Sequence, residues 1–220
     1  METRNIGSLT VPLVGLGCNN FGGRIDEAAT KLVVDAAIDS GANFFDTADV
    51  YGGTKSEEFL GRVLQGRRDK VILATKFGHK IDEEHKGAHP TYVKQACEDS
   101  LRRLQTDFID LYQLHTPDET VPIADTLGAL DELVKAGKVR EIGCSNFSVP
   151  QLQEAARAAT GARFRSVQNE FSMLKRDPIT NGVLDECGRQ GLAFLPYFPI
   201  ASGLLSGTPR PKAQGGATAG

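Results

Sequence analysis

Short apolar runs rich in strand-forming residues alternate with longer amphipathic stretches along most of the chain. The apolar runs predict strands at Leu13–Leu16, Asn43–Phe45, Val71–Thr75, Phe108–Leu114, Val139–Gly143, Ser166–Gln168 and Leu192–Pro196. The stretches between them have helical spacing and predict helices near Asp26–Ser40, Ser56–Leu64, Pro90–Leu104, Pro122–Lys135, Pro150–Ala158 and Pro178–Arg189. Since helix-length connections join parallel strands, this alternation predicts an α/β fold with a parallel sheet.

Boundary residues support the helix assignments. Polar caps or prolines stand near three helix starts, at Pro90-Thr91, at Ser148 before Pro150, and at Asp177 before Pro178. Glycines suited to left-handed helix ends lead from helix to strand at Gly41, Gly137 and Gly191.

The residues that end the strands favour one parallel arrangement over another. Polar, chemically capable side chains follow strand after strand, at Asp46, Lys76, His115, Ser145-Asn146, Gln168-Asn169 and Tyr197. In a (β/α)8 TIM-type barrel all such ends meet at one face, which carries the active site. The alternative, a doubly wound sheet, needs a glycine-rich phosphate turn after its first strand. The segment from Gly15 to Asn20 lacks the third glycine of that turn and enters no helix, so a barrel is the preferred interpretation.

Composition and charge exclude several classes of partner. The chain has 220 residues, 40% of them hydrophobic and 24% charged, with a net charge of -3. This balance favours neither a nucleic acid nor a membrane surface as partner. No signal-peptide core and no membrane-spanning run is found, so we expect a cytoplasmic protein. The cysteines are Cys18, Cys97, Cys144 and Cys187, far apart and without CxxC spacing, and we expect free thiols and no metal site.

Several motifs in consistent order resemble the aldo-keto reductase family. They are Phe44–Gly52 (FFDTADVYG), Ser56–Gly61, Ala74–Lys76, Asp110–His115, Gly143–Phe147, Gln168–Glu170 and Tyr197–Leu205. The style of these motifs is nearest to the bacterial reductases related to potassium-channel β subunits. The resemblance implies reduction of an aldehyde or ketone to an alcohol by hydride from a nicotinamide cofactor.

A catalytic tetrad of Asp46, Tyr51, Lys76 and His115 follows from the resemblance. Tyr51 would donate the proton to the forming alkoxide. Lys76 would lower the pKa of that phenol, and Asp46 would compensate the lysine charge. His115 would orient the carbonyl oxygen. The other histidines, His79, His85 and His89, have no such partner and are assigned to a solvated loop within Phe77–His89, with a substrate mouth as the second interpretation of that loop.

The cofactor site is likewise implied by motif match. Ser145, Asn146 and Gln168 would bind the carboxamide, and Tyr197 would stack on the nicotinamide ring. The pyrophosphate would meet backbone amides of a segment of small and apolar residues, Phe198, Pro199, Ile200, Ala201, Gly203 and Leu204. NADPH is expected by family habit, with NADH as the alternative, since the family's late basic segment has no counterpart here.

The predicted barrel is incomplete, because no eighth strand follows the seventh, at Leu192–Pro196. We therefore expect a barrel truncated after about the seventh strand over residues 1–207, and a disordered tail over 208–220. Three interpretations follow: a fragment of a longer product, closure of the open edge by oligomerisation, or a marginally stable remnant. Besides a reductase of small carbonyl compounds, the sequence leaves open a nicotinamide-binding regulatory or partner-binding module with little turnover.

Overall fold

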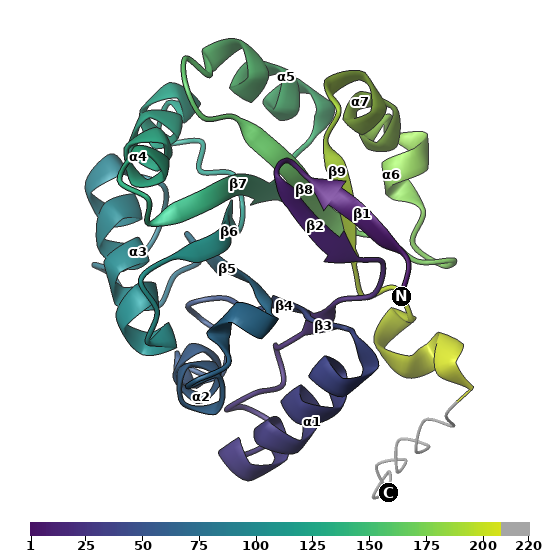
Figure 1. Cartoon of the computed structure of the whole chain (residues 1–220). Coiled ribbons are helices and arrows are strands. Elements are labelled where there is room, and N and C mark those ends of the chain that lie inside the picture. The colour runs from purple at the N-terminus through teal and green to yellow at the C-terminus, as the bar shows by residue number, and fades with distance from the viewer. Residues whose placement is uncertain (208–220) are drawn as a thin grey trace, which may run out of the picture.

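A computed structural model describes residues 1–207; the predicted tail over 208–220 lies outside the described residues. Seven parallel strands form one sheet in the order of the chain (Figure 1). They are β3 Leu16–Gly17, β4 Phe44–Asp46, β5 Ile72–Phe77, β6 Ile109–Leu114, β7 Val139–Ser145, β8 Phe164–Glu170 and β9 Ala193–Tyr197. Each pairs with its sequence neighbour, and the sheet forms a nearly closed barrel of the predicted (β/α)8 type with seven strands, in which β3 and β9, the first and last, do not pair with each other.

Helices surround the strands in Figure 1. They are α1 Glu27–Ser40, α2 Lys55–Val63, α3 Pro90–Leu104, α4 Ile123–Lys135, α5 Val149–Ala158, α6 Asp177–Thr180 and α7 Val183–Gln190, with 3-10 turns η1 Arg68–Lys70 and η2 Ala201–Ser206. Ser148 caps α5 in a capping box with Gln151, and Gly41, Gly137 and Gly191 have positive φ as predicted. The single helix predicted near Pro178–Arg189 is wrong, because Gly182 at φ 82° separates α6 from α7.

A hairpin that was not predicted closes one end of the barrel. Its strands are β1 Thr3–Ile6 and β2 Leu9–Pro12, joined by Gly7-Ser8 (Figure 1). Ile6, Leu9 and Val11 are buried against the first residues of the barrel strands, among them Phe44 and Ile72. The hairpin therefore fills the amino-terminal end of the barrel and leaves the carboxyl-terminal end for the strand-end side chains.

The first barrel strand also differs from the prediction. Leu13 and Val14, expected in a strand, are each 57% exposed, and pairing begins only at Leu16. The central strands agree better: every residue of β6 is buried, as is typical of a parallel sheet covered on its outer face by helices. All four cysteines are buried free thiols, and free thiols were predicted.

Candidate active site

The carboxyl ends of the strands bring the four residues of the predicted tetrad together. Asp46 is the last residue of β4, Lys76 lies near the end of β5, and His115 directly follows β6. Tyr51 lies in the loop between β4 and α2. Gly52 allows this loop to approach the backbone of Phe21. Its φ is 61°, which favours glycine, and a Cβ there would lie 2.4 Å from the carbonyl oxygen of Phe21.

Lys76 is the buried centre of the group. Its side chain is fully buried and its Nζ donates to Asp46 Oδ2 at 2.6 Å and to the carbonyl oxygen of Thr47 at 2.9 Å. The same Nζ lies 5.2 Å from the centroid of the Tyr51 ring. Burial is the largest single effect and works against the ammonium, but the charges and hydrogen bonding of Asp46 and Tyr51 together outweigh it, so the pKa of Lys76 is raised and the side chain stays a cation.

Two glutamines complete the surroundings of Asp46. Gln113 Nε2 donates to Asp46 Oδ1 at 3.0 Å, and Gln168 Nε2 donates to Asp46 Oδ2 at 3.2 Å. Gln113 is a positioning partner that the sequence analysis missed. Its place two residues before His115, on the inward face of β6, is the signal that identifies it in retrospect.

The pKa of Tyr51 corrects one sequence expectation. Lys76 does act to lower it, as predicted, but burial is the larger effect, and Asp46 also raises it, so the pKa of Tyr51 lies above its usual range. The phenol is therefore protonated at neutral pH, which suits a group that must hold a proton until the acceptor develops negative charge.

His115 is a neutral side chain in this site. Burial, then the charge of Lys76, lower the pKa of His115 to about 2. Its ring lies 5.7 Å from that of Tyr51, edge on, and its Nδ1 is buried with no hydrogen bond to any described residue. The neutral imidazole of His115 and the phenol of Tyr51 therefore offer two polar groups that can bind the same substrate oxygen.

The assignment of His79 to a solvated loop is wrong. Its ring is partly buried and packs edge on against that of His115, with centroids 4.0 Å apart. The preceding Gly78 has φ 107°, and a Cβ there would lie 3.0 Å from the side chain of Leu114, the last residue of β6. His85 and His89 do belong to the loop: His85 contacts Asp82, and His89 caps α3. His79 therefore lies beside the tetrad residue His115.

The residues predicted to bind a nicotinamide line the next three strand ends. Ser145 Oγ donates to the carbonyl oxygen of Gln168 at 2.7 Å, and Asn146 Nδ2 donates to the carbonyl oxygen of His115 at 3.0 Å. Tyr197, at the end of β9, donates from its hydroxyl to Asn146 Oδ1 at 2.9 Å. These hydroxyl and amide groups offer both donors and acceptors, as a carboxamide requires, so the residues present fit the nicotinamide half of a cofactor.

The segment predicted to meet a pyrophosphate follows β9 directly. Its members are Phe198, Pro199, Ile200, Ala201, Gly203 and Leu204. Phe198, Ala201 and Gly203 have positive φ, at 52°, 48° and 91°. Right-handed Ile200 followed by left-handed Ala201 is the backbone alternation that turns successive N–H groups toward an anion. This backbone suits the predicted contact.

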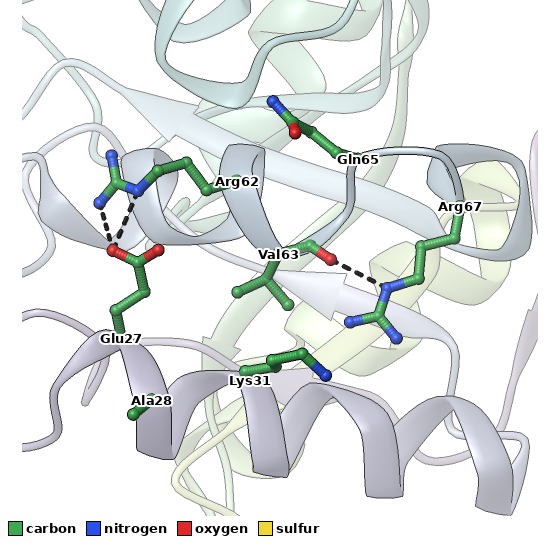
Figure 2. Close-up of a pocket in the computed structure, with 7 residues that line it drawn as sticks. All are labelled: Glu27, Ala28, Lys31, Arg62, Val63, Gln65 and Arg67. Carbon is green, nitrogen blue, oxygen red and sulfur yellow. Dashed lines mark hydrogen bonds and ion pairs between the residues drawn. The ribbon is translucent and has the colours of Figure 1, made fainter.

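A separate cleft lies on the outside of the barrel, between α1 and α2 (Figure 2). It has a volume of about 640 Å³ and is lined by Glu27, Ala28, Lys31, Arg62, Val63, Gln65 and Arg67. Its cations already have partners: Arg62 contacts Glu27, and Arg67 and Lys31 both contact Asp35. None of the four tetrad residues lines this cleft.

Comparison with known proteins agrees with this arrangement. The family model described as "Aldo/keto reductase family" matches residues 13–218. The chain belongs to the aldo/keto reductase family. It is 38% identical to aldo-keto reductase YhdN of Bacillus subtilis over 88% of this chain, and 36% identical to aldo-keto reductase yakc [NADP(+)] of Schizosaccharomyces pombe over 94%. The chain spans 60% and 63% of the length of these two relatives.

Solved aldo-keto reductases share the fold. A thermostable aldo-keto reductase, Tm1743, in complex with the inhibitor epalrestat, aligns with TM-score 0.85 and 30% identity over 94% of this chain and 76% of that chain. The holo form of AKR11C1 from Bacillus halodurans aligns with TM-score 0.85 and 36% identity over 98% of this chain and 72% of that chain. Members of the family are carbonyl oxidoreductases that use NAD(P)H. No helix among residues 1–207 is long and apolar enough to cross a membrane.

Proposed function

We propose that this chain carries the proton-transfer site of an NADPH-dependent reductase that converts aldehydes or ketones into alcohols. The observation that carries the proposal is the contact of the buried Lys76 with Asp46 at 2.6 Å, beneath the ring of Tyr51. Family membership supports the reaction class, and the NADP(+) in the name of the yeast relative supports the cofactor.

Tyr51 is the proton donor in this proposal. As the substrate oxygen gains negative charge, the phenol proton moves to it, and the phenolate that remains is stabilised by the Lys76 ammonium. Asp46 keeps Lys76 charged and in place, because a buried cation without a counter-charge is costly. Neutral His115 donates a hydrogen bond to the same oxygen and orients it.

A nicotinamide bound by Ser145, Asn146 and Gln168 would supply the hydride, with Tyr197 against one face of its ring. The chain's own contribution is to fix that ring relative to Tyr51. Small carbonyl compounds are the proposed substrates, and His79, which contacts His115, would lie beside them together with the loop within Phe77–His89.

The direct test mixes the purified chain with NADPH and a reactive aromatic aldehyde and follows loss of the reduced cofactor. A parallel titration of cofactor fluorescence measures binding. Steady consumption of NADPH is expected. Cofactor binding without turnover would contradict the reductase proposal and favour a nicotinamide-binding regulatory module, and absence of both would refute the cofactor assignment as well.

A further inference from the structure

Two buried carboxyl groups lie behind the tetrad, on the helix side of β5. Asp49, in the loop between β4 and α2, and Glu57, in the first turn of α2, are both 0% exposed. Gly61 brings α2 against the end of α3, where a Cβ would lie 2.3 Å from the carbonyl oxygen of Arg103. This close packing encloses both carboxyl groups together.

The nearby cations cannot neutralise both acids. Arg103 Nε donates to Glu57 Oε2 at 2.6 Å, and Thr75 Oγ1 donates to Glu57 Oε1 at 2.5 Å. Lys76 is paired with Asp46. Neither carboxyl oxygen of Asp49 has a hydrogen bond of normal geometry with a described residue. Asp49 is thus a buried acid without a counter-charge, a setting that favours its uncharged form.

The pKa of Asp49 agrees with this geometry. Burial, then the negative charge of Glu57, raise the pKa of Asp49 to about 8. Arg103, the backbone N–H of Val50 and Lys76 oppose the shift but do not cancel it. The other titratable groups that face Asp49 are the phenols of Tyr92 on α3 and Tyr112 on β6, and the pKa of each is itself raised, chiefly by burial.

Backbone hydrogen bonds connect the loop of Asp49 to Lys76 and to Tyr51. Its N–H donates to the carbonyl oxygen of Lys76 at 3.0 Å. Two residues later, Tyr51 N–H donates to the carbonyl oxygen of Ala48 at 3.2 Å, and Tyr51 accepts from Ser56 N–H at 3.2 Å. A displacement of Asp49 is therefore transmitted to Tyr51 through one short turn.

We propose that Asp49 is a positioning residue for Tyr51: the uncharged, fully buried side chain of Asp49 keeps the loop in place for proton transfer to the substrate. This inference rests on the proposed reductase function. Its consequence is an alkaline limit on activity: once Asp49 ionises, a second buried negative charge repels Glu57, and the turn that carries Tyr51 moves away from Lys76.

The test compares Asp49→Asn, which has nearly the same shape but cannot ionise, with Asp49→Ala, which leaves a gap. Asp39→Asn, on the exposed side of α1, is the matched control. Steady-state rates with NADPH and an aldehyde are measured between about pH 6 and about pH 10. Wild type and Asp39→Asn should lose kcat/KM with a midpoint near pH 8, set by Asp49.

At neutral pH, Asp49→Asn should keep the wild-type rate, whereas Asp49→Ala should lose it. In Asp49→Asn the alkaline fall in kcat/KM should move to higher pH. The loss in Asp49→Ala should be about tenfold in kcat, with little change in KM, because the loop and not the substrate contact is altered. The proposal is overturned if the Asp49→Asn profile coincides with that of wild type, or if Asp49→Asn is folded but inactive at every pH.

A second measurement separates this inference from the proposed function. The ring of Tyr51 is followed by NMR in protein carrying ¹³C-labelled tyrosine, with Tyr51→Phe to assign its signal. The signal should shift with a midpoint near pH 8 in wild type and stay constant over that range in Asp49→Asn. If no aldehyde is reduced at any pH, the reductase proposal fails, but this NMR titration still decides the role of Asp49. A Tyr51 signal that titrates in the same way in wild type and Asp49→Asn refutes that role.

Discussion

Replacement of Lys76 by methionine should separate the effect of the lysine charge on the reaction rate from the effect of its side-chain volume. Methionine fills similar space in the barrel but offers no cation to Tyr51. The Lys76 Nζ lies 5.2 Å from the centroid of the Tyr51 ring, inside a fully buried side chain. A unit charge at about that distance stabilises a phenolate by about 3 kcal/mol at an effective dielectric constant of about 20.

Only part of that energy is realised at the transition state, because the proton is only partly transferred there. A loss of about half of it slows the reaction by roughly tenfold, and the loss of all of it by roughly 200-fold. We therefore expect Lys76→Met to lower kcat by about 10- to 200-fold. Asp46 keeps its hydrogen bonds from Gln113 and Gln168 in the variant, so the site should stay folded.

The assay is the steady-state rate of NADPH oxidation with an aldehyde, together with cofactor binding by fluorescence and unfolding by urea. Lys138→Met is the control, since Lys138 forms an exposed pair with Glu98 far from the strand ends. A Lys76→Met protein that is folded, binds NADPH and reduces the aldehyde at the wild-type rate would refute the role given to the ammonium.

Two further predictions concern titrating groups, and the first is one of stability. The pKa of Asp49 is about 8 in the fold and about 3.9 when unfolded. The stabilising contribution of protonated Asp49 to the free energy of unfolding is therefore fully present below about pH 4 and is lost as pH rises through about 8. Asp49→Asn should therefore gain stability over wild type by up to ~1.4 kcal/mol per pH unit in that range, measured by urea unfolding, and a difference independent of pH would contradict this. The second concerns His115: since its pKa is about 2, it stays neutral in any ordinary assay, and His115→Gln should lower kcat without changing the shape of the acid side of the pH profile. An acid limb near pH 6 that disappears in His115→Gln would show that the histidine titrates there.

The sequence predicted the parts of the fold that depend on local pattern. Helix α3 has the predicted bounds, Pro90–Leu104, because its proline start and amphipathic spacing agree. The hairpin of β1 and β2 was missed because its strands have only four residues each, too short for clear alternation, although Gly7-Ser8 between Ile6 and Leu9 is a turn signal. The tetrad residues were brought together as predicted, since strand ends meet at one face of a barrel.

Side-chain environments were not predictable in the same way. Asp49 and Glu57 resemble ordinary solvated charges in the sequence, and only the packing of α2 against α3 buries them. The direction of the Tyr51 pKa was also missed, because a motif names the neighbouring lysine but does not show the degree of burial. The contact of His79 with His115 lies in a loop next to Gly78, where the sequence has no periodic pattern.

The proton-donor role of Tyr51 is tested most directly by Tyr51→Phe, which removes one hydroxyl and retains the ring. Tyr112→Phe makes the same change in a buried tyrosine on the outer face of β6, whose hydroxyl contacts the carbonyl oxygen of Val93. With NADPH binding verified for each protein, we expect Tyr51→Phe to reduce the aldehyde at least ~100-fold more slowly than wild type, and Tyr112→Phe to retain activity. A Tyr51→Phe protein that reduces the aldehyde as fast as wild type would contradict the account.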